Sequence, residues 1–170
     1  MTDYVSDYED VTTWTLDLDQ EQVLLGLQKE CVFMWTTQAG EPVGVTHSFL
    51  EIDGRLWMTA AEERKRVAAV RRDPRTCVCV TSTGTSMGEG KTITYKGTTV
   101  VHPKEDRVIK DWFYAIFAEK RYGSRGPDYV QQMIALIDSP NRVILEFIPG
   151  KKISHDRDKM EAATAPLEAK

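Results

Sequence analysis

The chain has 170 residues, of which 41% are hydrophobic and 28% charged, and its formal net charge is −4. This composition is typical of a single soluble globular domain, and the negative charge argues against a dedicated nucleic-acid-binding protein, which needs a basic face. The sequence contains no apolar run long enough to span a membrane and no visible secretory signal, so we expect a cytoplasmic protein with neither nucleic acid nor membrane as a partner.

Both ends of the chain differ from its middle. Residues 1–20 carry carboxylates but no lysine or arginine, so we predict a loose acidic N-terminal arm that leads into a short helix at "DQEQVLLGLQ", capped by Asp19. The last stretch, "RDKMEAATAPLEAK" (157–170), is small, charged and aperiodic, and it is predicted to be a flexible tail. One domain is therefore expected over residues 21–156.

Most of this domain has the pattern of β-strands. Strand-like runs cover residues 31–37, 42–52, 55–60, 76–83, 91–101 and 141–154, and Asp53-Gly54 is a strong signal for a tight hairpin. About six strands joined largely by hairpins predict a mainly β (α+β) protein whose antiparallel sheet curls into a barrel. Cys31, Cys77 and Cys79 lie in these runs and are interpreted as buried, reduced thiols. A metal site made by Cys77, Cys79 and a histidine is a weaker alternative, because the chain has no second cysteine pair.

Three segments interrupt the β pattern and are predicted to be helices. They are residues 62–73, which end at Asp73-Pro74, residues 103–122, and residues 127–137. The second segment has one strongly apolar, aromatic face. We expect this face to pack against the barrel, although part of it could instead contact a partner subunit.

The first of these helices raises the question of function. Arg64, Lys65 and Arg66 fall in its first turn, directly after a strand that ends near Thr59. Cations at the positive end of a helix dipole are unfavourable unless an anion is bound there, and free backbone N–H groups at that end also favour phosphate. Either these side chains are simply solvated, or they form an anion site. The basic residues at the far end of the helix are interpreted as surface charges.

The stretch "GTSMGEGKT" (84–92) is similar to a phosphate-binding P-loop, but two features exclude that role. The spacing of its glycines is wrong by one residue, and a strand pattern follows it instead of the helix that a P-loop requires. We therefore predict a flexible loop between strands, with Lys91 and Thr92 at the start of the next strand.

The order of these features resembles a known family. The chain has hairpin strands, then "TAAEERKRVAAVRRDPR" from Thr59, and then a β pair ending in "KTITYKG". This order resembles the pyridoxamine 5′-phosphate oxidase-like split barrels, in particular their flavin- and deazaflavin-dependent oxidoreductase branch. The resemblance covers about residues 20–156. It implies a six-stranded antiparallel split β-barrel with two to four peripheral helices, and a homodimer that binds FMN or the deazaflavin coenzyme F-420 at the subunit interface.

The resemblance also implies which residues contact the cofactor. The backbone of one strand would run along the cofactor ring, two groups of polar and basic residues would bind its phosphate, and a tyrosine would make a weaker contact across the dimer. The strand residues are Val45, Thr46, His47 and Ser48. The phosphate-binding residues are Thr59, Arg64, Lys65 and Arg66 in one group and Lys91 and Thr92 in the other, and the tyrosine is Tyr122. Thr92 stands where the branch usually has glutamine.

The expected function is hydride transfer to or from a small organic substrate that the sequence does not identify. "FIPGKKISHDRDK" replaces the C-terminal Trp and Arg motif of true pyridoxamine phosphate oxidases, which argues against their substrate. No catalytic side chain is assigned, since His47 is as consistent with a packed residue as with an acid. The alternative is a non-catalytic protein that binds or stores a flavin, haem or another ligand in the same groove.

Overall fold

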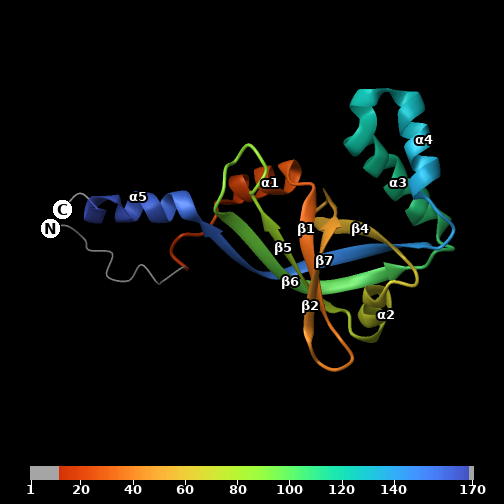
Figure 1. Ribbon diagram of the computed structural model, residues 1–170, viewed down its shortest axis with the longest axis horizontal. Coiled ribbons are helices and arrows are strands. Elements are labelled where there is room, and N and C mark those ends of the chain that lie inside the picture. The colour runs from red at the N-terminus through yellow and green to blue at the C-terminus, as the bar shows by residue number, and fades with distance from the viewer. Residues whose placement is uncertain (1–11, 169–170) are drawn as a thin grey trace.

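The computed structural model describes residues 12–168, and the side chains of residues 165–168 lie outside that description. Its centre is a curled antiparallel sheet with the strand order β2-β1-β5-β6-β7-β4-β3 (Figure 1). The strands are β1 (Glu30–Thr36), β2 (Pro42–Ser48), β3 (Leu50–Ile52), β4 (Arg55–Ala61), β5 (Arg75–Thr81), β6 (Lys91–His102) and β7 (Arg142–Asp156).

The curvature of the sheet follows from its connectivity. β2 and β3 are the two edge strands, yet only Phe49 separates them along the chain. The two edges must therefore approach each other, which curls the sheet into a barrel that is split at this point. The sequence predicted residues 42–52 as one strand, and the break at Phe49 gives the sheet seven strands in place of six. The prediction of a split barrel is confirmed.

Residues 12–168 contain five α-helices, one more than the upper limit predicted. They are α1 (Leu18–Leu27), α2 (Lys65–Arg72), α3 (Arg107–Tyr122), α4 (Pro127–Ile137) and α5 (Arg157–Glu168). α5 occupies the segment for which the sequence predicted a flexible tail. Residues 1–11 of the predicted acidic arm lie outside the described part of the chain, and the helix that follows begins after Asp17 and not after Asp19. No helix within residues 12–168 is both long and apolar enough to cross a bilayer.

Two local predictions can be compared with the backbone. Asp53 and Gly54 have φ angles of 52° and 75°, as a tight hairpin turn requires, and they join β3 to β4 as predicted. α2 begins at Lys65, three residues later than expected, because Arg64 is extended and forms the N-cap. Glu62 lies before the helix, where its carboxylate pairs with Arg71.

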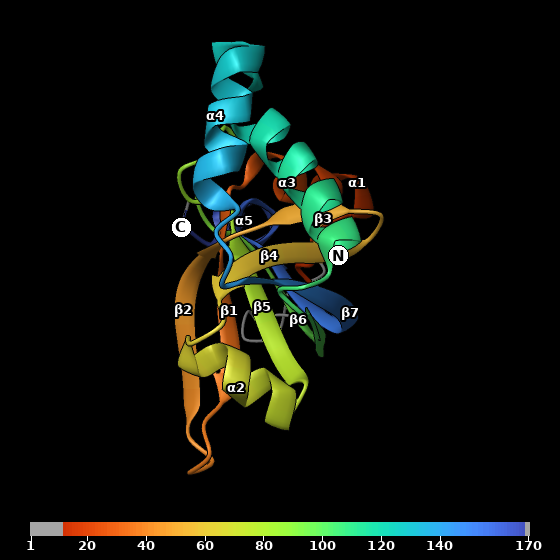
Figure 2. The same cartoon turned by 90° about the vertical axis from the view of Figure 1, so that its right-hand side faces the viewer.

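The buried apolar residues form two clusters. One fills the curled sheet and includes Phe33, Met58 and Phe147. The other lies between the sheet and α3 and includes Trp57 and Phe113, which confirms that the aromatic face of the second predicted helix packs on the barrel. Figures 1 and 2 show that the rest of the α3–α4 hairpin projects beyond the sheet.

A buried ion pair fixes the base of this hairpin. The ammonium of Lys110 in α3 is 2.9 Å from Asp138 Oδ1, just after α4, and the Lys110 side chain is 1% exposed. Arg107 adds a hydrogen bond of 2.7 Å to the other oxygen of Asp138. The start of α3 and the end of α4 are thus held together by opposite charges, one of which is fully shielded from water.

Candidate functional site

A cavity of about 290 Å³ lies between the barrel and the α3–α4 hairpin. It brings together five of the residues predicted to bind a cofactor with three others. β2 contributes Thr46, His47 and Ser48; β4 contributes Thr59; α2 contributes Arg66; and the additional lining residues are Phe117, Ile137 and Arg142. Figure 2 shows these elements together, with β2 at the left edge, α2 below β4 and the hairpin above.

β2 offers backbone groups as well as side chains. It is an edge strand that pairs only with β1, so one side of its backbone has no strand partner within the described residues. Unpaired N–H and C=O groups at a sheet edge are available for a ligand. The segment Thr46–Ser48 therefore presents hydrogen-bonding backbone at the border of the cavity, and Val45 precedes it on the same strand.

His47 has a defined protonation state. Burial lowers its pKa, and the nearby cations Arg66 and Arg142 lower it further, although the hydrogen bond to the Ser48 carbonyl acts in the opposite direction. The imidazole is therefore neutral at pH 7. His47 Nδ1 is 3.0 Å from the Ser48 carbonyl oxygen, which can only accept, so the proton is on Nδ1 and Nε2 is an acceptor. His47 Nε2 is buried and has no partner within residues 12–168.

The cations of the site are not neutralised. Burial lowers the pKa of Arg66, and the positive charges of Arg64 and Arg142 lower it further. None of these three arginines forms an ion pair with a described residue, and Arg66 Nε is buried without a partner. A cluster of like charges without counter-charges is unfavourable by itself and is stabilised by a bound anion. Arg64 and Lys65 were also predicted to bind the phosphate, but neither lines the cavity: Arg64 is the N-cap of α2 and Lys65 is its first residue.

The sequence did not identify Arg142 as part of the site. It begins β7, which pairs with β4 although the two strands are far apart in the chain, and this pairing places it opposite Ala61. The available signal was a cation directly before the buried run "VILEF". Without the order of the strands, that signal does not distinguish a site residue from an ordinary strand end.

Thr59 connects the cavity to the hairpin. Its hydroxyl donates to the Val143 carbonyl oxygen at 3.1 Å and is 2.8 Å from the hydroxyl of Tyr114 in α3. Since the Thr59 proton is used on the carbonyl, Tyr114 is the donor in the second contact. Thr59 retains one lone pair toward the cavity, and its position is fixed by two elements of the fold.

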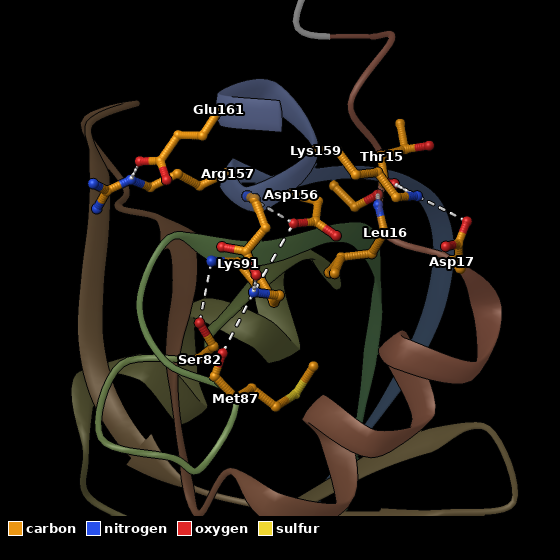
Figure 3. A network of polar contacts seen from close by, with 12 residues as sticks. Thr15, Leu16, Asp17, Ser82, Met87, Lys91, Asp156, Arg157, Lys159 and Glu161 are labelled. Carbon is orange, nitrogen blue, oxygen red and sulfur yellow. Dashed lines mark hydrogen bonds and ion pairs between the residues drawn. The ribbon is translucent and has the colours of Figure 1, made fainter. Parts of the chain in front are cut away.

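Lys91, Thr92 and Tyr122 do not line this cavity. Lys91 is at the opposite end of the β6–β7 pair, where it faces Asp156, and only 5% of the residue is exposed. Its ammonium pairs with Asp158. It also donates to the Met87 carbonyl at 3.4 Å (Figure 3). Within one chain, Lys91 therefore holds α5 and the loop before β6 together instead of facing Arg66.

The other two residues also have contacts elsewhere. Thr92 follows Lys91 in β6 and pairs with His155, and the ring of Tyr122 packs against Tyr129 with centroids 5.9 Å apart. The loop that resembled a P-loop leads into β6, which confirms that no helix follows it.

The cysteines were predicted to be buried, reduced thiols, and the prediction of burial is correct for Cys31 alone. All three are free thiols, Cys31 being buried and Cys77 and Cys79 half-buried. The described residues contain no group of three or more His, Cys, Asp or Glu side chains placed to hold a metal ion.

Comparison with known proteins gives matches at the level of structure alone. No family model matches the sequence, and no curated protein matches it. A conserved hypothetical protein from Mycobacterium tuberculosis aligns with a TM-score of 0.73 at 16% identity, covering 86% of this chain and 89% of that one. An F420 reductase aligns with a TM-score of 0.58 at 16% identity, covering 78% and 94%.

A third match carries a family description. A Clostridium acetobutylicum protein related to general stress protein 26, described as pyridoxinephosphate oxidase family, aligns with a TM-score of 0.58 at 16% identity. The alignment covers 85% of this chain and 99% of that chain. At such identities the similarity establishes a common fold and leaves the activity to be argued from the cavity.

Proposed function

We propose that this chain, which has the fold of the pyridoxamine 5′-phosphate oxidase-like split barrels, is an oxidoreductase that uses a flavin-type cofactor, either FMN or the deazaflavin coenzyme F-420. The observation that carries the proposal is the pair Arg66 and Arg142, two cations that line one cavity without a counter-charge among the described residues. A cofactor phosphate would supply that charge. The F420 reductase with the same fold supports a cofactor of this class.

The residues of the cavity fit the parts of such a cofactor. Arg66 and Arg142 would bind the phosphate, and the positive charge of Arg64, which acts on Arg66, would add to the attraction. The open backbone of Thr46–Ser48 would hydrogen-bond the edge of the ring, and His47 Nε2 is an acceptor without a partner. The orphaned polar atoms and the ligand are therefore complementary in charge and in hydrogen bonding.

When bound, the cofactor supplies the hydride chemistry, and the protein positions it. Phe117 and Ile137 form an apolar wall opposite β2 and exclude water from the ring. Tyr114 keeps Thr59 in place beneath that wall. Neutral His47 accepts a hydrogen bond and does not deliver a proton, so we assign it to binding.

We further propose a homodimer as the functional unit. A cavity of about 290 Å³ is at the small end of the range for cofactor pockets. Thr92 and Tyr122 lie outside it in the same chain, and a second copy is the route by which they would contact the cofactor, whereas Lys91 is buried and paired within its own chain. Sedimentation of the purified protein with and without FMN tests this proposal, since a monomer in both conditions would refute it.

A binding or storage protein is the second candidate. The observation that favours it is that no titratable side chain among the described lining residues has a proton free for the cofactor. His47 is neutral and donates its Nδ1 proton to the Ser48 carbonyl, and the other titratable lining residues are arginines. Turnover distinguishes the two candidates. In an enzyme, the bound cofactor is bleached by a reductant and restored by an acceptor over many cycles, whereas a storage protein releases or retains it without turnover.

Titration of the full chain with FMN and with F-420, followed by fluorescence and visible absorbance, tests the cofactor site. We expect one of the two to bind, and Arg66→Met to weaken binding by about tenfold or more, because a charge-assisted contact is lost. Arg66 has no ion pair to lose, so the variant should remain folded. Arg75→Met is the matched control, since Arg75 is exposed and pairs with Asp73. The proposal is refuted if neither cofactor binds or if Arg66→Met binds like the wild type.

A further inference from the structure

A second cavity, of about 500 Å³, adjoins the proposed cofactor site. The two cavities share Ser48 of β2 and Phe117 of α3 as lining residues. The remaining lining residues of the second cavity come from the α1–β1 connection, the loop after β5 and the end of α3: Leu27, Gln28, Lys29, Glu30, Thr83, Gly84, Thr85 and Arg121. A ligand in this cavity would therefore lie next to one bound along Thr46–Ser48.

Arg121 is the distinctive residue of this cavity. Its Nη2 donates to the backbone carbonyls of Lys29 at 2.6 Å and of Phe49 at 2.7 Å. Its Nε is buried without a partner, and Nη1 has no hydrogen bond to any residue in the described part of the chain. Burial lowers the pKa of Arg121, while the neighbouring groups Tyr122 and Glu30 act in the opposite direction. No carboxylate among residues 12–168 forms an ion pair with it.

The guanidinium is held in place before any ligand arrives. The two carbonyl bonds fix one edge of the group, and its central carbon lies 5.6 Å from the centroid of the Phe117 ring. The hydrogen bonds of Nη2 have a structural role, because they link α3 to the β2–β3 connection. Nη1 takes no part in this link. Glu30 also lines the cavity and its charge acts on Arg121, but no carboxylate of the described residues is paired with the guanidinium. A preorganised guanidinium with a free donor and no paired carboxylate is suited to a planar oxyanion.

The opposite wall of the cavity is also built from fixed contacts. Gln28 donates to the carbonyls of Thr81 and Thr83 at 2.6 and 3.1 Å, which holds the start of the loop after β5. Lys91 holds the same loop from its other side through the Met87 carbonyl. Lys29 adds a positive charge to the lining, and Lys120 lies with Arg121 in a smaller neighbouring cavity.

We infer that Arg121 is the anchor of an oxyanion subsite that binds the carboxylate or phosphate group of a small organic substrate. The remainder of the substrate extends across Ser48 and Phe117 toward the cofactor. The identification of this ligand as a substrate rests on the proposed function, whereas the subsite itself depends only on the geometry around Arg121. The substrates of this protein are therefore organic acids or phosphate esters.

The test is an NMR titration of the full chain, labelled with ¹⁵N, using benzoate, inorganic phosphate and neutral benzamide as probes. We expect saturable shifts of the backbone amides of Gln28–Glu30 and Thr83–Thr85 with at least one of the two anions. Benzoate alone indicates a carboxylate and phosphate alone a phosphate ester, and both results support the subsite. Arg121→Gln retains a donor for the carbonyls but removes the charge, and it should weaken anion binding about tenfold or more. Arg125→Gln is the control, since Arg125 stacks on Tyr129.

Three results would overturn the inference: no saturable shift with either anion, equal shifts with benzamide, or unchanged affinity in Arg121→Gln. Unshifted amide signals of β5 and β6 show whether that variant remains folded. FMN and F-420 are titrated separately and read at Thr46–Ser48. Loss of cofactor binding with intact anion shifts would refute the proposed function alone, and the reverse result would refute the subsite alone.

Discussion

Replacement of Asp138 by alanine tests how the α3–α4 hairpin is held over the cavity. Asp138 accepts from Arg107 and pairs with the buried ammonium of Lys110, and it directly follows Ile137, which lines the cavity. In Asp138→Ala, Lys110 keeps its burial but loses its counter-charge. Because a lone buried charge cannot be solvated, the single substitution is expected to cost much more than the removal of a surface pair.

The magnitude follows from the burial of the two partners. Breaking a buried pair by removing one partner costs about 3–5 kcal/mol, and the contact with Arg107 adds little because that side chain is exposed to solvent. Burial acts to raise the pKa of Asp138, but the contacts with Arg107 and Lys110 outweigh it, and the pKa lies below its usual value. A lowered carboxylate pKa stabilises the fold above about pH 4, and this contribution is lost as the pH falls through the native pKa.

Urea unfolding at pH 7, followed by the fluorescence of the tryptophans, measures this loss. Asp128→Ala, at the start of the same helix, is the matched control and should cost less than about 1 kcal/mol. The double variant Lys110→Met/Asp138→Ala removes both charges and should recover most of the stability. A loss below about 1 kcal/mol in Asp138→Ala, or a double variant no more stable than that single one, would refute the reasoning.

Three further predictions concern other parts of the molecule. Because the pKa of His47 is lowered in the folded protein, the free energy of unfolding should decrease as the pH falls from about 7 to 5. His47→Gln should make this free energy less dependent on pH, which urea unfolding at each pH measures. Gly97→Ala should destabilise the protein by about 1–3 kcal/mol, because the new Cβ would clash with the Ile148 carbonyl. Gly26→Ala in α1 has free space around the new Cβ and should stabilise the protein by about 0.5–1 kcal/mol. Melting temperatures equal to that of the wild type would contradict both predictions. Burial raises the pKa of Cys31 to about 12, so iodoacetamide at pH 8 should modify it only after unfolding, and mass spectrometry showing equal labelling of all three cysteines would exclude this.

Elements with local signals could be predicted from the sequence. The Asp53-Gly54 turn has its expected position, and α4 spans Pro127–Ile137 as predicted, because proline at the first position and apolar spacing are properties of the segment itself. The break at Phe49 was missed, since nothing in a continuous apolar run marks the point at which a strand moves from one sheet edge to the other.

α5 shows the limit of a local interpretation. Its sequence is rich in small and charged residues and gave no apolar stripe. Its first turn is held by ion pairs with partners that are distant in the chain, Lys91 with Asp158 and Asp17 with Lys159. Contacts of this kind depend on the folded sheet and cannot be identified from the helix alone.

The candidate site was predicted where the residues are close in sequence and missed where they are not. Thr46–Ser48, Thr59 and Arg66 line one cavity, as the family resemblance implied. Arg142 is positioned by the β4–β7 pairing and Arg121 by the packing of the helical hairpin on the sheet. The sequence pattern predicted neither arrangement. Lys91 had the right residue type for a phosphate contact, but burial beside Asp156 and Asp158 gives it a structural role within its own chain.

The position of the α3–α4 hairpin between β6 and β7 has a consequence for how this protein can diverge. His102 and Ile144 are neighbours across the two strands, so residues 103–141 leave the sheet and return to the same place. The entropic cost of closing such an inserted segment grows only with the logarithm of its length. The barrel also has a hydrophobic core of its own. The strands that line the cavity and the helical wall carrying Phe117, Ile137 and Arg121 can therefore change separately. Selection or engineering can exchange this one segment to change one wall of the cavity while the barrel and its core are retained.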